Sequence, residues 1–240
     1  MPAKIKICGI STPEALDATI AARADYAGLV FYPASPRAVT SNVAGALTSR
    51  AAGQIAMVGL FVDADDAVIA DALVAAKLNA LQLHGSESPE RVAQLRARFG
   101  KPVWKALPVA SASDVARAAA YAGAADLILF DAKTPKGALP GGMGLAFDWS
   151  LLAGYRGALP WGLAGGLNPT NVAEAIARFR RRWSIPPAAS KARRASRIPT
   201  RLPISPLRCA WPKSRRSIGV VQRKDRLAGA PLPSGEVGKI

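Results

Sequence analysis

The sequence predicts an α/β fold of the (β/α)8 TIM-barrel class, with about seven recognisable βα units and a missing or aberrant eighth unit. Three observations support this prediction. Strand-like and helix-like segments alternate with short connections from the start of the chain. The strand-like runs are almost continuously apolar, as in parallel strands covered on both faces. Reactive side chains recur where these runs end, which is where barrel enzymes carry their active sites.

Seven strands are expected, and a helix is expected after each. An open doubly wound sheet would also fit seven parallel strands, but no G-x-G-x-x-G motif follows the first strand, so the barrel is preferred. Ser88-Pro89 and Asn168-Pro169 each place a capping side chain before a proline suited to a first helical turn. The expected strands are 4–8, 26–31, 55–62, 80–84, 103–108, 126–131 and 161–164, and the helices begin near residues 13, 42, 65, 89, 113, 147 and 170.

The eighth unit of the barrel does not follow. After Phe179 the sequence becomes rich in Arg, Pro and Ser, with 8 of the 19 prolines in the last 61 residues. We therefore divide the chain into an incomplete barrel domain, residues 1–179, and a basic tail, residues 180–240, which we expect to be disordered. Loss of the eighth strand would leave the first and seventh strands with unpaired edges. Poor stability, aggregation and little activity are the expected consequences.

The strong positive charge of the chain is confined to this tail. Residues 1–179 hold 16 of the 32 Lys and Arg residues and 14 of the 16 Asp and Glu residues, so the net charge of +16 arises almost entirely after residue 179. A basic tail could bind nucleic acid through phosphate contacts. This one lacks interleaved aromatic residues and a recognisable fold signature, so we prefer a function without a nucleic-acid partner.

Cysteine usage and hydropathy indicate a cytoplasmic protein. Cys8 and Cys209 lie in unrelated contexts and do not suggest a disulfide, which favours a reducing compartment. The first residues lead directly into a short strand instead of an apolar signal segment. No run approaches the roughly 20 apolar residues that a membrane span needs, so we expect no membrane association.

Two strands end in groups that could transfer protons. Cys8 closes the first strand, and Asp131 closes the sixth. A thiolate can act as a base, and a protonated carboxyl can act as an acid. Each residue also has an ordinary structural explanation, since free cysteines are often buried as small apolar side chains and Asp131 could cap a helix or form a loop ion pair.

Other strand ends carry candidates for binding. Gly165-Gly166 precedes a helix start, where backbone N–H groups suit a phosphate, although glycine pairs are also common in turns. His84 could be a hydrogen-bonded structural histidine, and Arg37 a solvated loop charge. For each of these residues, only the pattern that they form together favours a functional role over a structural one.

In order and spacing, these segments closely resemble phosphoribosylanthranilate isomerase, a barrel enzyme of tryptophan biosynthesis. The resemblance covers residues 4 to about 178. The matching motifs are K-I-C-G-I at 6–10, G-L-V-F-Y-P-A-S-P-R at 28–37, V-G-L-F-V at 58–62, L-Q-L-H-G-S-E at 81–87, L-I-L-F-D at 127–131, G-G-M-G-L-A-F-D-W at 141–149 and L-A-G-G-L-N-P-T-N-V at 163–172.

The resemblance implies an aldose–ketose isomerase, an intramolecular oxidoreductase. The reaction is the Amadori rearrangement of N-(5-phosphoribosyl)anthranilate to 1-(2-carboxyphenylamino)-1-deoxyribulose 5-phosphate, without cofactor or metal. Asp131 matches the general acid that opens the ribose ring, and Cys8 matches the general base that removes the proton from C2. Enzymes of this family occur as monomers and homodimers.

The resemblance also implies how the substrate is held. Arg37 matches the residue that binds the anthranilate carboxylate, and its planar guanidinium suits this contact. Gly165 and Gly166 match half of the phosphate site, and Gln82 and His84 are expected to line the pocket. A related barrel isomerase, such as one of histidine biosynthesis, is an alternative, but those enzymes use paired aspartates at strand ends, whereas the first strand here ends in Cys8.

The tail departs from the family, which ends in an eighth strand and turn of the form V-D-x-S-S-G-V-E. Codons permitted from Trp183 onward, taken one base earlier, allow V-D-S-S-G-G-V-E and a following helix through Ser205. We infer a one-base shift between about Ala177 and Trp183, with the tail as its product. The chain as written would then be an inactive frameshifted relative of the enzyme, unless the sequence itself was misread.

Overall fold

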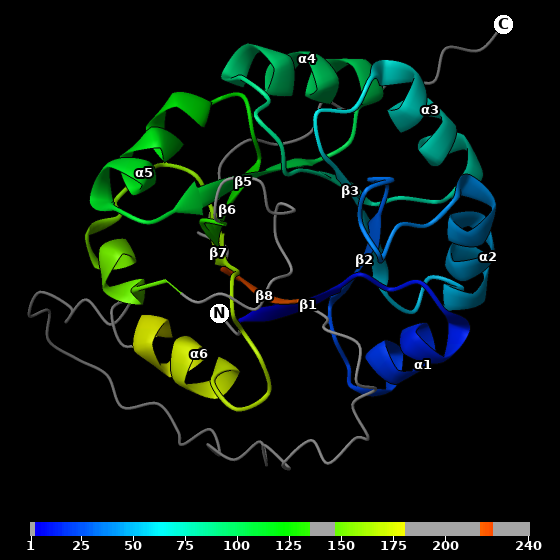
Figure 1. Ribbon diagram of the computed structural model, residues 1–240, viewed down its shortest axis with the longest axis horizontal. Coiled ribbons are helices and arrows are strands. Elements are labelled where there is room, and N and C mark those ends of the chain that lie inside the picture. Colours follow the sequence, from blue (N-terminus) through cyan, green and yellow to red (C-terminus); the bar gives the residue numbers. More distant parts are fainter. Residues whose placement is uncertain (1–2, 135–146, 181–216, 223–240) are drawn as a thin grey trace, which may run out of the picture.

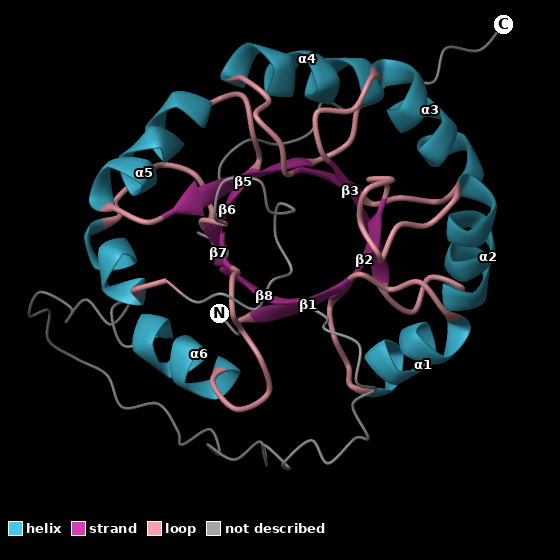
Figure 2. Ribbon diagram, viewed as in Figure 1, coloured by secondary structure: helices cyan, strands magenta, loops and turns pink. Residues whose placement is uncertain are grey.

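The computed structural model describes residues 3–134, 147–180 and 217–222, which form a closed barrel of eight strands inside a ring of helices (Figures 1 and 2). Adjacent strands follow chain order around the barrel, from β1 to β8. The strands are β1 (Lys4–Cys8), β2 (Tyr26–Val30), β3 (Ala56–Phe61), β4 (Ala80–Leu83), β5 (Val103–Val109), β6 (Leu127–Ala132), β7 (Trp161–Leu163) and β8 (Ser217–Gln222). The helices are α1 (Pro13–Ala21), α2 (Ser41–Ala51), α3 (Asp66–Ala75), α4 (Pro89–Phe99), α5 (Ala112–Ala116) and α6 (Val172–Arg180), with 3-10 helices η1 (Arg117–Tyr121) and η2 (Trp149–Gly154).

The first seven strands confirm the prediction, and each is parallel to its predecessor. Helix starts agree with the local chemistry of the sequence. Ser88 accepts a hydrogen bond from the N–H of Arg91 at 3.2 Å, and Pro89 occupies the first turn of α4. Two expected helices differ, because the segment after residue 147 forms only the 3-10 helix η2 and the segment near residue 113 is divided into α5 and η1.

The apolar residues separate into a layer outside the barrel wall and a filling within it. The outer cluster contains every buried apolar helix residue, together with alternate strand residues such as Ile7 and Phe61. Within the wall, a second cluster takes residues from successive strands, including Tyr26 and Trp104, whose rings meet edge to face at 5.0 Å. A small third cluster of Cys8, Val30 and Leu60 also belongs to strands alone. Alternation along each strand therefore directs one set of side chains to the helices and the other to the barrel interior.

The expectation of unpaired edges on β1 and β7 is wrong. Strand β8, which lies within the basic tail, fills the position between them and runs antiparallel to both. Its pairing with β1 extends from Cys8 opposite Ser217 to Lys4 opposite Val221. Ile218, Val220 and Val221 are β-branched residues with high strand propensity. The sequence predicts that the eighth unit is missing or aberrant, and the structure shows that it is aberrant. An eighth strand is present, but it runs antiparallel to its two neighbours.

Other sequence-based expectations for the tail concern residues 181–216 and 223–240, which lie outside the described residues, as does the G-G-M-G-L-A part of the motif at 141–149. In the described part of the chain, Cys8 is a free, buried cysteine. No helix there is long and apolar enough to cross a membrane.

Candidate active site

The carboxyl ends of strands β1–β7 meet at one end of the barrel, which we call the mouth. Because parallel strands share their direction, the residues that end them gather on the same rim. Cys8, at the end of β1, and Asp131, near the end of β6, both lie at this rim and are both buried. The barrel thus brings the predicted thiol and carboxyl, 123 positions apart in the chain, to the same end of the molecule.

The Cys8 thiol has an ammonium group as a neighbour. Lys6 lies two residues earlier on β1, so its side chain emerges from the same face of the strand. A Cβ atom added to Gly28, on β2, would lie 2.8 Å from Cys8 Sγ and 2.8 Å from Lys6 Nζ. The two groups therefore share the space above Gly28, and Lys6 is itself buried. A positive charge therefore lies close to the predicted base.

Arg37 is held beside Cys8 by the loop after β2. This loop folds back on its strand, since the Val39 N–H donates to Val30 O at 2.9 Å. The Arg37 side chain crosses directly over Gly9, where an added Cβ would lie 2.6 Å from its Cδ and 2.8 Å from its Nη1. Gly9 has a φ of 85° and no side chain, so it permits this approach. The predicted carboxylate-binding residue thus lies over Gly9, the residue that follows the predicted base.

Asp131 is fixed through both of its carboxyl oxygens. Oδ1 accepts a hydrogen bond from the Ala132 N–H at 2.8 Å, and Oδ2 lies 3.0 Å from His84 Nε2. His84 Nδ1 in turn lies 3.0 Å from Gln82 Nε2. The structure therefore joins three of the sequence-predicted residues in one hydrogen-bonded row.

A cavity of about 310 Å³ opens beside this row. His84 and Asp131 line it, together with Pro108 of β5 and Arg117 of η1. Gln82 is not among the lining residues, because it is buried below His84 with an exposed fraction of 1%. Direct contact between Gln82 and a substrate stays a prediction, whereas His84 faces a space that a small molecule could enter.

The turn after β7 approaches Asp131 closely. Gly165 and Gly166 have φ angles of 75° and 66°, which favour glycine. A Cβ on Gly165 would come closest to the Ala132 N, which donates to Asp131, and would lie 2.7 Å from the Ala132 Cβ and 2.9 Å from Asp131 Oδ1. Gly165 therefore has a steric role at the carboxyl group in addition to its predicted role at a phosphate.

Replacing Gly165 by Ala is expected to lower kcat about 100-fold, because the new methyl group displaces the Asp131 carboxyl, and small displacements of reacting groups have effects of this size. Gly53→Ala is the matched control. Gly53 also has a positive φ, 79°, but an added Cβ there meets no atom within 4 Å. Steady-state kinetics of both variants measure the difference. Equal losses in the two variants would show that backbone strain alone is responsible.

A buried ion pair supports the loop that carries His84. Lys105 of β5 donates to Glu87 Oε2 at 3.0 Å and to the carbonyl oxygens of Gly85 at 2.7 Å and Ala106 at 2.9 Å. Glu87 also accepts the N–H groups of Gly85, at 3.0 Å, and of Asp63, at 3.0 Å. Burial lowers the pKa of the Lys105 ammonium, and the charge of Glu87 opposes that shift. This network ties together the loops after β3 and β4.

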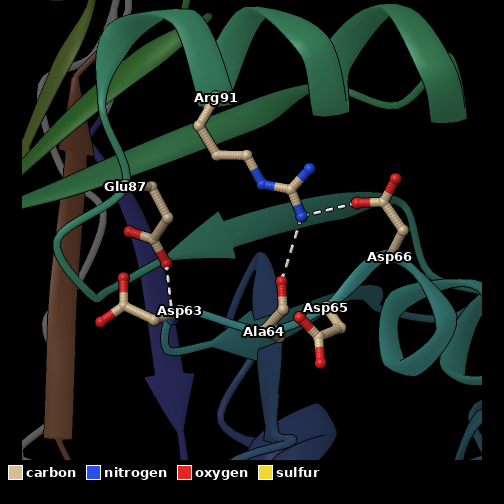
Figure 3. A pocket seen from close by; sticks show the side chains of 6 residues that line it. All are labelled: Asp63, Ala64, Asp65, Asp66, Glu87 and Arg91. Carbon is tan, nitrogen blue, oxygen red and sulfur yellow. Dashed lines mark hydrogen bonds and ion pairs between the residues drawn. The ribbon is translucent and has the colours of Figure 1, made fainter.

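The outer side of these loops forms a second hollow of about 460 Å³, rich in carboxylates (Figure 3). Several of its polar groups bind one another: Arg91 binds Asp66 and donates to Ala64 O at 3.2 Å, and Glu87 Oε1 accepts the N–H of Asp63. The hollow lacks the thiol, the histidine and the sixth-strand carboxyl of the mouth. We interpret it as the outer face of the loop support.

Replacing Lys105 by Met is expected to destabilise the fold by about 3–5 kcal/mol, since Glu87 is then left as an uncompensated buried charge. The free energy of unfolding in urea measures the loss. The double variant with Glu87→Gln should be less destabilised than Lys105→Met alone, and Lys77→Met, at an exposed position, should change stability little. A loss below about 1 kcal/mol would contradict an essential buried pair.

The sequence-based reasoning missed Lys6, Lys105 and Glu87. Alternation along β1 was a usable signal for Lys6, since it places this side chain on the same face as Cys8. No comparable signal exists for Lys105 and Glu87, which lie 18 positions apart and pair only because β4 and β5 are adjacent.

A closed barrel with polar and reactive side chains gathered at the carboxyl ends of its parallel strands is the arrangement of (β/α)8-barrel enzymes. A family model described as N-(5'-phosphoribosyl)anthranilate (PRA) isomerase matches residues 5–184. The chain belongs to this phosphoribosylanthranilate isomerase family. The match stops close to the predicted boundary between barrel and tail.

Individual relatives agree. The N-(5'-phosphoribosyl)anthranilate isomerase of Paramagnetospirillum magneticum is 53% identical over 177 residues, which are 73% of this chain and 82% of the relative. A solved structure of monomers of the dimeric enzyme from Thermotoga maritima is 37% identical, with a TM-score of 0.62 over 73% of this chain and 81% of that one. Another, in complex with reduced 1-(o-carboxyphenylamino)-1-deoxyribulose 5-phosphate, is 35% identical, with a TM-score of 0.62 over 73% and 81% of the two chains.

Proposed function

We propose that this barrel catalyses the isomerisation of N-(5'-phosphoribosyl)anthranilate in tryptophan biosynthesis. The observation that carries the proposal is the placement of Cys8 and Asp131 at the mouth of a barrel that belongs to the isomerase family. An aldose–ketose rearrangement needs one group that donates a proton and another that removes one. A carboxyl and a thiol at the same mouth supply such a pair.

In this proposal Asp131 is the acid. Its carboxyl protonates the ribose ring oxygen, so the C1–O bond breaks and the nitrogen lone pair forms a Schiff base. The bonds from His84 and Ala132 keep the carboxyl oriented toward the mouth. Asp131 is buried but lines the cavity at the mouth, so a substrate bound there would shield the transferred proton from bulk water.

Cys8 is the base in the following step. The thiolate removes the C2 proton, and the electron pair of the broken C–H bond forms the C1–C2 double bond while the Schiff-base nitrogen regains its lone pair. Ketonisation of this enol gives the ketose. Lys6 Nζ lies close to the Cys8 thiol, and Arg37, next to Gly9, holds the anthranilate carboxylate.

The direct experiment is to incubate the purified chain with N-(5'-phosphoribosyl)anthranilate and separate substrate and product by chromatography. Conversion above the uncatalysed rate supports the proposal. A frame-restored protein that also fails to convert the substrate would refute it. We place the reaction in the cytoplasm, and the enzyme as a monomer or homodimer, on the basis of the relatives and the sequence.

The one-base shift remains part of the proposal. Strand β8 closes the barrel wall, but because it is antiparallel its amino end lies at the mouth, with Ser217 opposite Cys8. The turn that follows an eighth parallel strand, which completes the phosphate site in the family, therefore has no counterpart among the described residues. We infer that the chain as written binds the phosphate weakly through Gly165 and Gly166.

A further inference from the structure

His84 is the only histidine in the chain, and both of its ring nitrogens have a partner. Nε2 lies 3.0 Å from Asp131 Oδ2, and Nδ1 lies 3.0 Å from Gln82 Nε2. The row reaches from β4 to β6 across the intervening strand β5. The β5 residue Ala106, with a small side chain, belongs to the cluster inside the barrel wall.

The Gln82 side chain presents its amide nitrogen to Nδ1 of His84. An amide nitrogen can only donate, so the Nδ1 atom that faces it must accept, and the neutral ring then carries its hydrogen on Nε2. Nε2–H is directed at Asp131 Oδ2. Among the described residues, Gln82 Oε1 has no hydrogen-bond partner. The opposite amide orientation would instead leave the NH2 group without one, and buried orphaned N–H groups are the rarer case.

We propose that Gln82 and His84 are positioning residues: Gln82 fixes the Nε2–H tautomer of His84, and His84 uses that hydrogen to hold the Asp131 carboxyl in its working orientation. This inference rests on the proposed function, in which Asp131 is the acid. Oδ2 is held by His84 on the β4 side, and Oδ1 is held by the Ala132 N–H and faces Gly165. The carboxyl plane is thereby fixed between two loops of the mouth.

The tautomer can be measured directly, because a single histidine gives a single set of imidazole signals. The experiment is a long-range 15N–1H correlation spectrum of the full chain labelled with 15N-histidine at pH 8. Nε2 is recognised by its coupling to both carbon-bound ring protons. We expect Nε2 to appear protonated and Nδ1 unprotonated. A protonated Nδ1, in either the other tautomer or an imidazolium ion, would overturn the proposal.

Two substitutions of Gln82 test whether this residue sets the tautomer of His84. Gln82→Met removes the donor, so the Nδ1 and Nε2 signals should shift toward each other as both tautomers become populated. Gln82→Glu presents an acceptor, so Nδ1 should become protonated. Gln94→Met, at an exposed position on α4, is the matched control and should leave the spectrum unchanged. An unchanged spectrum in both Gln82 variants would show that Gln82 does not set the tautomer.

The contact with the carboxyl is tested by Asp131→Ala. We expect the Nε2 resonance to shift and the Nδ1 resonance to keep its position; an unchanged Nε2 resonance would refute the contact. These spectra do not require turnover. If the tautomer is as expected but Asp131→Asn retains full activity, the proposed function fails while the hydrogen-bonded row stands. If Asp131 is essential but the spectra disagree, only the positioning inference fails.

Discussion

Replacing Asp131 by Asn is expected to lower kcat by about two to four orders of magnitude, the usual contribution of a general acid or base. Asn has nearly the same shape and can still accept hydrogen bonds through its amide oxygen, but it has no carboxyl proton to give. Cys8→Ala should produce a loss of the same size, because the base is removed. Steady-state kinetics on the frame-restored protein, with substrate in excess, measure both effects.

The matched control for Asp131→Asn is Asp71→Asn, at an exposed position on α3, which should retain full turnover. Thermal unfolding of each variant separates a loss of chemistry from a loss of folded protein. If Asp131→Asn and Cys8→Ala both turn over at the wild-type rate, the assignment of acid and base is wrong, whatever the family resemblance.

Restoring the reading frame between codons 177 and 183 is expected to raise kcat/KM by roughly 10²–10⁴. The restored turn would supply new hydrogen bonds to the substrate phosphate, and each bond to a charged group is worth about 1.5–3 kcal/mol. Two such bonds account for this factor, since each 1.4 kcal/mol corresponds to tenfold. Parallel kinetic measurements on the two proteins, as written and as restored, provide the comparison.

Sequencing the coding DNA across codons 170–190 is the control for this experiment. A missing or additional base there would identify the tail as the product of a shift. An unaltered frame together with full activity of the chain as written would contradict our expectation and would mean that β8 permits adequate phosphate binding by other means.

Seven strands could be predicted from the sequence because each one is a short apolar run. Apolar runs such as Leu127–Phe130 are recognisable without knowledge of the fold, and so are the Ser-Pro and Asn-Pro sequences at helix starts. The positions of Cys8 and Asp131 at the mouth follow from the predicted strand ends, since a residue that ends a parallel strand must lie on the rim.

Strand β8 could not be predicted in this way. Its six residues include three β-branched ones, but they lie between basic, proline-containing segments without apolar periodicity. What stabilises such a strand is the pair of free edges on β1 and β7, which exists only after the other strands have assembled. The hydrogen bonds of Gln82 and His84 depend in the same way on adjacent strands and leave no periodic signal.

The reversed direction of β8 separates two properties that are joined in an ordinary barrel. Pairing with β1 and β7 uses backbone hydrogen bonds. Such bonds need an extended segment of suitable length and do not depend on particular side chains. Ligand recognition needs particular residues at the end where the strand exits, and reversal sends that end to the opposite side of the molecule. Strand β8 can therefore close the barrel without supplying the binding residues that an eighth parallel strand would place at the mouth.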